Sequence, residues 1–332
     1  MVKIAVDAFG GDHSPEEIVK GAISAVEKKE FGVALVGKRA EIEEELNKYT
    51  YDPDYIEIIE ASEVISNNES PTEAIRVKKD SSIVVGLSET KKRDDIVAYF
   101  SCGSTGANLT GAIFKIGRIK GVQRPCLATT LPNLKNGKTL LLDLGANTDC
   151  KPEYLEQFAV MGSAFMKMSE GIENPKVAVL SNGTEDHKGN SLTKAAFELI
   201  KARSDINFVG NMEARDVLSG EYDVIVADGF DGNVALKSTE GAILAVLSFL
   251  KAGIKSRFLS KIGALLMKPT FKELKTKLDY NKVGGAVLLG VEKVVVKGHG
   301  SSKADSVCAA IKQAYSLYKS GYIDEIKNKL VL

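Results

Sequence analysis

The sequence predicts a three-layer α/β/α fold built on a mainly parallel sheet. Short apolar runs rich in Val and Ile alternate with longer segments of helical period, which is the pattern of repeated βα units. The 332 residues are 44% hydrophobic and provide enough apolar surface for a large core. No internal repeat, low-complexity tract or Pro/Gly/Ser linker divides the chain. We therefore expect a single domain over residues 1–332.

Ten apolar runs predict strands, and helices fill most of the gaps between them. The first helix has the clearest beginning, with Ser14 expected as its N-cap and Pro15 at the first helical position. Glu16 and Glu17 then face the positive end of the helix dipole, and the helix is predicted to end near Lys29. In chain order the predicted strands are 3–8, 32–37, 55–60, 95–101, 127–131, 138–144, 176–181, 206–210, 222–228 and 292–297.

A basic amphipathic segment at 255–278 stands out in a chain with 44 basic and 44 acidic residues. It contains seven basic residues and one acidic residue, a net charge of +6, and Pro269 is expected to break it into a helical hairpin over about 251–282. A subunit interface, a membrane-surface helix, a dock for an acidic protein, and an ordinary core or dimer helix with a solvated basic face remain alternatives. The candidate contact residues are Arg257, Phe258, Leu259, Lys261, Leu266 and Lys268.

Six predicted strands end in loops rich in Gly, Asn, Asp and Ser. In an open α/β sheet the ligand crevice lies at the carboxyl ends of the strands, so we expect these loops to line one polar cleft. Their backbone amides and helix starts suit an anion such as phosphate. All three histidines lie in the loops; His13 and His299 are expected to contact a ligand, whereas the sequence does not decide for His187. The six loops are 9–13, 101–106, 145–147, 182–190, 228–233 and 298–302.

Composition and motifs exclude several classes of function. The balanced charge and the absence of Trp argue against a nucleic-acid-binding protein. No Gly-x-Gly-x-x-Gly follows the first strand and no Walker motif is present, which argues against NAD and against a P-loop ATPase. His and Cys spacings typical of metal sites are missing, so neither a metal nor another cofactor is expected. The scattered cysteines favour a cytoplasmic protein, and we expect no leader and no membrane-spanning run.

Two side chains in the loops are candidates for chemistry. Cys102 follows a strand and precedes a probable helix start, where the dipole would lower a thiol pKa, although a small buried residue is the alternative. Lys188 lies in the 182–190 loop, from which it could reach a phosphate group; a solvated loop lysine is the alternative.

Seven motifs, spread in order over nearly the whole chain, resemble those of the bacterial phosphate acyltransferase family PlsX. The resemblance implies a fold related to phosphotransacetylases and isocitrate/isopropylmalate dehydrogenases, and a homodimer. It also implies transfer of a fatty acyl group from acyl carrier protein to inorganic phosphate, with acyl-phosphate feeding phospholipid synthesis at the cytoplasmic membrane surface. The motifs are 4–13, 117–121, 142–147, 183–186, 210–215, 228–234 and 298–302.

The resemblance assigns catalytic roles to Lys188 and Asn233. Where Phe9, Cys102 and Ser104 stand, the family often has methionine, alanine and asparagine, and His187 is not typical of it; a Cys102 nucleophile is therefore less expected.

The chemistry then requires a positioned phosphate and a donor to the thioester carbonyl oxygen. We expect loops 10–13, 104–106 and 299–302 to bind phosphate, Lys188 to supply charge, and Asn233 to donate to the carbonyl oxygen. Asp12 would orient His13 or the loop backbone, because a carboxylate repels a phosphate dianion. Phosphate is itself a competent nucleophile near neutral pH, and a leaving thiol with a pKa of about 8.5 departs with little protonation. We therefore expect direct attack by phosphate without an acyl-enzyme. The predicted substrate contacts are Asp7, Gly10, Gly11, His13, Ser104, Thr105, Gly106, Asn147, Asp228, Gly229, His299, Gly300 and Ser301.

Two other functions remain open on the sequence. One is a short-chain phosphotransacetylase that uses acyl-CoA, and the other is a non-catalytic membrane adaptor that retains the fold and uses the basic hairpin.

Overall fold

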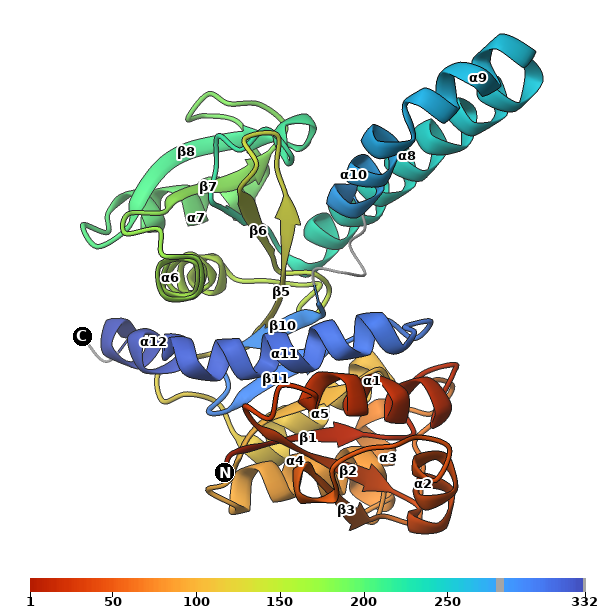
Figure 1. Cartoon of the computed structure of the whole chain (residues 1–332). Coiled ribbons are helices and arrows are strands. Elements are labelled where there is room, and N and C mark those ends of the chain that lie inside the picture. Colours follow the sequence, from red (N-terminus) through yellow and green to blue (C-terminus); the bar gives the residue numbers. More distant parts are fainter. Residues whose placement is uncertain (279–283, 331–332) are drawn as a thin grey trace.

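One mixed sheet of eleven strands runs through the computed structural model, which describes residues 1–278 and 284–330 (Figure 1). The strands are β1 (Lys3–Asp7), β2 (Gly32–Gly37), β3 (Ile56–Glu60), β4 (Ile96–Ser101), β5 (Cys126–Pro132), β6 (Lys138–Leu142), β7 (Lys176–Ser181), β8 (Asn207–Glu213), β9 (Val224–Val226), β10 (Ala286–Leu289) and β11 (Val294–Lys297). Their order in the sheet is β3-β2-β1-β4-β11-β10-β5-β6-β9-β7-β8.

The sheet consists of two parallel blocks joined through antiparallel strands. β3, β2, β1, β4 and β11 are parallel to one another, and so are β6, β9, β7 and β8. Between the blocks, β10 pairs antiparallel with β11 and β5, and β5 pairs antiparallel with β6. Figure 1 shows the blocks as two lobes. The first lobe contains β1–β4 and β11, the second lobe contains β6–β9, and β10 and β5 cross from one to the other.

Helices cover both faces of the sheet, as a three-layer fold requires. The alternation of strand side chains places Ile4 and Val6 on one face with α1, α6 and α11, and Ala5 on the opposite face with α3–α5. The predicted α/β/α class is confirmed. The helices are α1 (Glu16–Val26), α2 (Arg39–Leu46), α3 (Pro71–Val77), α4 (Ser82–Lys92), α5 (Thr105–Gly111), α6 (Pro152–Glu170), α7 (Ser191–Lys201), α8 (Gly229–Ser256), α9 (Phe258–Leu266), α10 (Lys268–Leu278), α11 (Ala304–Ser320) and α12 (Tyr322–Leu330).

All ten predicted strands are present, but two local predictions are wrong. Strand β10 was not predicted, because Ala286–Leu289 is a four-residue apolar run with no alternation of its own. Ser14 does not cap α1: its hydroxyl donates to the carbonyl oxygen of Gly11 (3.0 Å), and the helix begins two residues later at Glu16. The hydroxyl therefore closes the preceding loop instead of the helix end.

Helices α8, α9 and α10 form an arm that projects from the second lobe (Figure 1). The chain reverses at Arg257, whose extended backbone separates α8 from α9, so the hairpin turn lies earlier than predicted. A second break, at Met267 just before Pro269, separates α9 from α10. Pro269 lies in the first turn of α10, where a missing N–H costs no helical hydrogen bond. Residues 279–282 of the predicted hairpin lie outside the described residues.

Helix α8 also contradicts the expectation that no segment matches a membrane span. It has 28 residues, and an 18-residue window in it has a mean hydropathy of 1.3, with only 11% of that window buried. The match concerns length and composition alone. Because α9 follows at once and turns back beside α8, the helix is one half of an exposed hairpin.

We expect Glu57→Gln to destabilise the first lobe in a pH-dependent way. The Glu57 carboxylate accepts hydrogen bonds from Arg93 (2.6 and 3.0 Å) and Lys3 (2.6 Å). The bonds from Arg93 and, to a smaller extent, the bond from Lys3 lower the pKa of Glu57 to about 2. Because the pKa of Glu57 is lower in the folded state than its ordinary value of 4.5, the ionised carboxylate stabilises the protein at pH values above 4.5. This stabilisation is lost as the pH falls toward 2. Urea unfolding should show a loss of about 1–2 kcal/mol at pH 7 that shrinks on acidification.

The matched control is Glu27→Gln. Glu27 is exposed and makes no ion pair within the described residues. An equal loss for both variants, or a loss at Glu57 that does not depend on pH, would show that the ion pairs do not stabilise the fold.

Candidate active site

A cavity of about 470 Å³ lies where loops from both lobes meet. The first lobe contributes Thr105 at the start of α5 and the 298–302 loop after β11. The second lobe contributes Gly145 in the loop after β6 and Asn233 in the first turns of α8. Leu127 and other residues of β5 form the wall between them. Four of the six predicted loops therefore do border one space, which we call the central cavity.

A buried hydrogen-bond network fixes the first-lobe wall. The hydroxyl of Ser101 donates to the Asp7 carboxylate (2.6 Å) and accepts from the backbone N–H of Gly103 (2.9 Å) and the side-chain amide of Asn108 (3.1 Å). Asp7 also accepts from the N–H of Phe9 (3.1 Å). Burial raises the Asp7 pKa, and the hydrogen bond from Ser101 opposes the shift. Asp7, a predicted substrate contact, thus lies beneath the loops and ties them together.

Gly10 lets the 9–13 loop pack against the 101–106 loop. A Cβ atom at this position would lie 2.5 Å from the Asp7 carboxylate and 2.6 Å from the backbone nitrogen of Gly103. Two residues later, the N–H of Asp12 donates to the carbonyl oxygen of Gly300 (2.8 Å). The loops after β1, β4 and β11 are therefore one connected unit. Ser104 caps α5 by accepting from the N–H of Ala107 (3.4 Å).

A second buried carboxylate organises the wall from the second lobe. Asp143 accepts hydrogen bonds from the backbone N–H groups of Leu127 (2.8 Å) and Asn147 (2.7 Å), and burial raises its pKa. The Asn147 side chain donates to the carbonyl oxygen of Pro125 (2.8 Å) and to Asp143 (3.0 Å). Both amide hydrogens of Asn147 are thus used within the protein. Like Asp7, this predicted substrate contact holds the loop in place.

The first turn of α8 packs directly on this loop. The N–H of Gly229 donates to the carbonyl oxygen of Asn147 (2.7 Å), and the Asp228 carboxylate caps the helix by accepting from the N–H of Asp231 (2.7 Å). A Cβ atom at Gly232 would lie 2.1 Å from the carbonyl oxygen of Asp143. This close approach sets the position of Asn233, the next residue along the helix.

Asn233 presents a free amide to the central cavity. Its side chain is exposed, lines the cavity beside Gly145, and has no hydrogen-bond partner within the described part of the chain. An amide can donate two hydrogen bonds and accept two. Asn233 is thus available to a ligand, in contrast to Asn147.

Lys297, at the end of β11, is a cavity residue that the sequence did not single out. It lines the central cavity, and its ammonium donates to the carbonyl oxygens of Cys102 (3.4 Å) and Gly298. Burial lowers its pKa, an effect that the nearby Cys102 and Asp7 oppose. An ammonium has three donors, so one remains for a ligand. The signal in the sequence was a lysine that ends the all-valine run Val294–Val296 directly before a loop.

Cys102 does not have the environment of a nucleophile. The residue is 1% exposed, and burial raises the pKa of its thiol to about 11. Its sulfur packs so close to Gly298 that a Cβ there would lie 2.6 Å from it. The alternative reading, a small buried residue at a strand end, is the one the structure favours.

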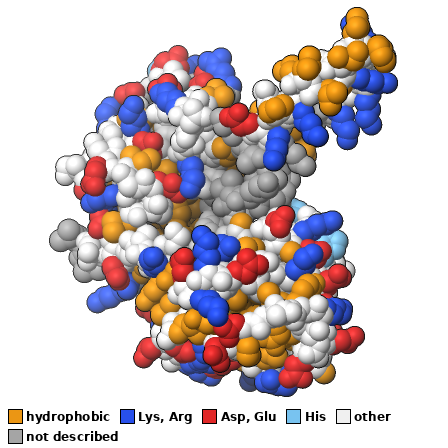
Figure 2. Space-filling view, in the orientation of Figure 1, with side chains coloured by type: hydrophobic (Ala, Val, Ile, Leu, Met, Phe, Trp, Pro, Cys, Tyr) orange, Lys and Arg blue, Asp and Glu red, His pale blue; other side chains and the backbone are white. Residues whose placement is uncertain are grey.

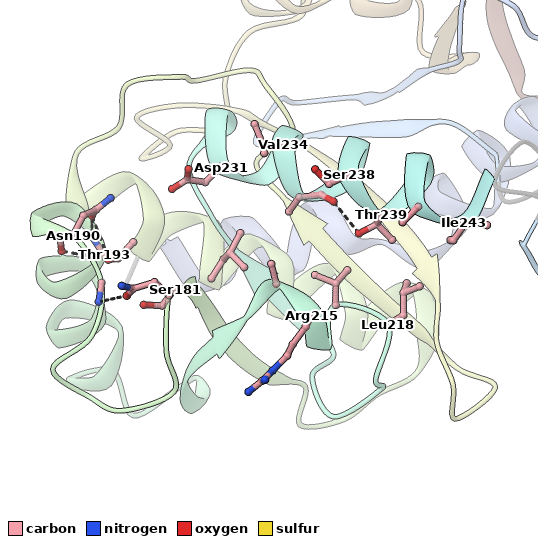
Figure 3. Close-up of a pocket in the computed structure, with 17 residues that line it drawn as sticks. Ser181, Asn190, Thr193, Arg215, Leu218, Asp231, Val234, Ser238, Thr239 and Ile243 are labelled. Atoms are coloured by element: carbon pink, nitrogen blue, oxygen red, sulfur yellow. Dashed lines mark hydrogen bonds between the residues drawn. The ribbon is translucent and has the colours of Figure 1, made fainter. Parts of the chain in front are cut away.

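The 182–190 loop lies on the other side of α8, so the prediction that all six loops line one cleft is wrong. Its residues border a second cavity of about 900 Å³ (Figure 3). α8 directs Asp231, Val234 and Ser238 to the second cavity and Asn233 and Leu236 to the central cavity. The helix thus separates the two spaces because residues three and four apart share one face.

Lys188 is half-buried and lines neither of the two cavities. Its backbone N–H donates to the carbonyl oxygen of Glu185 (3.0 Å), and its side chain covers Gly183. No hydrogen bond joins it to Asn233 in the described residues. The two residues to which the resemblance assigns catalysis thus lie on different elements, Lys188 in the 182–190 loop and Asn233 in the first turns of α8.

One of the three histidines lines a cavity and two do not. His299 lines the central cavity, and its Nδ1 lies 2.8 Å from the Ser301 hydroxyl. His13 and His187 are exposed and line neither cavity. No group of three His, Cys, Asp or Glu side chains suited to a metal ion occurs within residues 1–278 and 284–330.

Comparison with known proteins decides the family. A family model described as "Fatty acid synthesis protein" matches residues 2–325. A phosphate acyltransferase of Clostridioides difficile is 44% identical over 98% of this chain and 95% of its own. One of Caldanaerobacter subterraneus subsp. tengcongensis is 46% identical over 100% of this chain and 98% of its own. The chain belongs to the phosphate acyltransferase family PlsX. It is therefore an enzyme, as predicted.

Solved structures confirm the fold of this phosphate acyltransferase. A phosphotransacetylase from Streptococcus pyogenes superimposes with a TM-score of 0.65 at 16% identity and covers 96% of this chain and 94% of its own. A 4-hydroxythreonine-4-phosphate dehydrogenase from Klebsiella pneumoniae gives 0.54 at 12% identity, over 96% and 99% of the two chains. At these identities the likeness concerns architecture alone, and it matches the predicted relation to phosphotransacetylases and to dehydrogenases of this fold.

Proposed function

We propose that this phosphate acyltransferase moves a long-chain fatty acyl group from acyl carrier protein to inorganic phosphate and releases acyl-phosphate for phospholipid synthesis. The observation that carries the proposal is the central cavity, which offers the free amide of Asn233 and the buried ammonium of Lys297 without an activated nucleophile. Such a set can bind an anion and stabilise an oxyanion, and it does not form an acyl-enzyme.

In the proposed reaction a phosphate oxygen attacks the thioester carbonyl directly. Phosphate is held by the backbone amides and hydroxyls of the connected first-lobe loops and by the ammonium of Lys297. As the carbon–oxygen bond forms, Asn233 donates a hydrogen bond to the carbonyl oxygen, which becomes negatively charged. The carbon–sulfur bond then breaks and its electron pair leaves with the thiolate, which needs little protonation because the thiol pKa is about 8.5.

Lys188 takes part in this proposal as a second source of positive charge. The 182–190 loop is exposed over Asn182 and over residues 184–187, and Lys188 makes no side-chain hydrogen bond or ion pair in the described chain. Its ammonium is therefore available to a bound ligand. Its role in turnover rests on the resemblance.

The α8–α10 arm is the proposed contact with the donor or with lipid. Figure 2 shows apolar side chains at its outer end and basic side chains along one flank. Phe258, Leu259 and Leu266 are 76%, 80% and 79% exposed, and Arg257, Lys261 and Lys268 are exposed beside them. An acidic carrier protein and an anionic membrane surface both match this combination.

We expect Lys261→Glu/Lys268→Glu to weaken whichever contact the arm makes. Reversing two charges replaces attraction by repulsion without changing the cavity. Flotation with anionic liposomes and the KM for the acyl carrier donor, measured separately, should show a loss of about tenfold in one or both. Lys20→Glu/Lys312→Glu on α1 and α11 is the control; equal losses there would mean that only net charge matters.

We also propose a single-domain subunit, because the sheet is continuous across both lobes. It would act as a homodimer in the cytoplasm, peripherally at the inner face of the membrane. The exposed side chain of Phe249 in α8 supports a further contact surface on the arm.

The deciding experiment measures thiol release from long-chain acyl carrier protein with and without phosphate, and traps the product with hydroxylamine. Phosphate-dependent release with a trappable product supports the proposal. Faster turnover of short-chain acyl-CoA would favour a phosphotransacetylase, and no turnover of any thioester would favour a membrane adaptor. A covalently acylated protein after mixing with donor alone would contradict direct attack.

A further inference from the structure

An apolar pocket lies beneath α8, between this helix and the end of β5. Leucine, isoleucine and proline side chains make up most of its wall, and the one charged residue in it is Glu240. The Thr239 hydroxyl donates to the carbonyl oxygen of Ala235 (2.8 Å), so this polar atom is satisfied within the helix. We call the pocket the α8 groove. It is lined by Leu131, Pro132, Leu218, Leu236, Thr239, Glu240, Ile243, Leu244 and Leu247.

The α8 groove opens into the central cavity at one end. Leu131, Leu236 and Glu240 line both spaces, and Leu236 lies one helical turn from Asn233. Leu131 and Leu236 are only 6% and 9% exposed. An apolar wall therefore continues from the free amide of Asn233 into the groove.

The other end of the groove follows α8 toward the projecting arm. Ile243, Leu244 and Leu247 line this part, and Leu218 with Ile243 also borders the second cavity (Figure 3). From Asn233 to Leu247 the helix advances about 21 Å at 1.5 Å per residue. This is the length scale of a long fatty acyl chain.

We propose that the α8 groove is the binding site of the donor's acyl chain, with the thioester at Asn233 and the far end of the chain near Leu247. The inference rests on the proposed function. A flexible hydrocarbon chain suits the groove because Leu131 and Leu236 lie too deep for a folded partner or a second subunit to reach. The depth of the groove at Leu247 then sets the chain length that the enzyme prefers.

The test is Leu247→Trp, which fills the far end of the groove and leaves the central cavity intact. Its kcat/KM for a hexadecanoyl donor should fall about tenfold relative to wild type, whereas the value for a butanoyl donor should not change. Val246→Trp is the control, because Val246 is 64% exposed and does not line the groove. Its chain-length profile should match that of wild type.

A second measurement does not depend on the variant's folding. A fatty acyl thioester with a diazirine at the chain end, photolysed on the wild-type enzyme, should label the peptide that contains Ile243, Leu244 and Leu247. The proposed acyl site is wrong if the label appears on another peptide. It is also wrong if Leu247→Trp lowers kcat/KM equally for both donors, or lowers it for neither; in each case the enzyme activity itself still stands. Absence of phosphate-dependent release from every donor by the wild-type enzyme overturns the proposed function itself.

Discussion

Replacing Asn233 by alanine is expected to lower kcat by about 100- to 1000-fold with a smaller change in either KM. The Asn233 amide faces the central cavity without a partner in the described chain, and the tight contact of Gly232 with the Asp143 carbonyl oxygen fixes its position. A donor held in advance stabilises an oxyanion more than a neutral carbonyl, so its loss affects the transition state most. Steady-state kinetics with varied phosphate and varied donor measure the two KM values separately.

Two further variants distinguish donation from mere packing. Asn233→Asp keeps the size and removes the donor when ionised, so it should be at least as impaired as the alanine variant. Lys237→Ala alters the same cavity wall at a side chain that already pairs with Glu240 (2.8 Å), and it should retain near-normal kcat. Full activity of Asn233→Asp, or equal losses in all three variants, would remove Asn233 from the reaction.

The sequence predicted the parts of this site that depend on local chain chemistry. Apolar runs located the strands, and the glycines after them marked loops that must pack closely, as Gly10 and Gly232 do. It could not show that α8 passes between the 182–190 loop and the other loops, because this depends on the order in which β9 and β7 pair in the sheet. Six similar loops therefore looked like one cleft, although four border the central cavity, the 182–190 loop borders the second cavity, and the 9–13 loop lines neither.

Burial explains the predictions about individual polar residues. Asp7 and Asn147 have residue types that bind substrates, and only the folded chain shows that Ser101, Pro125 and other protein groups already occupy them. Lys297 is the opposite case: its sequence position, at the end of a strand, is typical of an ordinary solvated lysine, yet its side chain lines the central cavity. The pairing of β11 with β4 places it beneath the loop of Cys102. Tertiary contacts, which no local pattern encodes, decide which side chains are free.

The second large effect is expected at Lys297. Lys297→Met should raise the KM for phosphate by about 10- to 100-fold and leave the KM for the acyl donor nearly unchanged, because the ammonium is the buried positive charge of the cavity wall.

Lys188→Ala should mainly lower kcat with the protein still folded, because Lys188 lines neither cavity and acts only when the donor is bound. Phosphate titrations at saturating donor separate the two lysines. A large rise in phosphate KM for Lys188→Ala, with Lys297→Met unaffected, would reverse the assignment.

The pH dependence of phosphate binding tests the same ammonium. Burial lowers the pKa of Lys297 below the ordinary lysine value of 10.5, so this side chain loses its charge at a lower pH than an exposed lysine does. The phosphate KM of the wild-type enzyme should therefore rise with increasing pH on the alkaline side, before exposed lysines titrate. Lys297→Arg keeps its charge throughout this range and should flatten the profile. Parallel profiles for wild type and Lys297→Arg would mean that the titrating group lies elsewhere in the site.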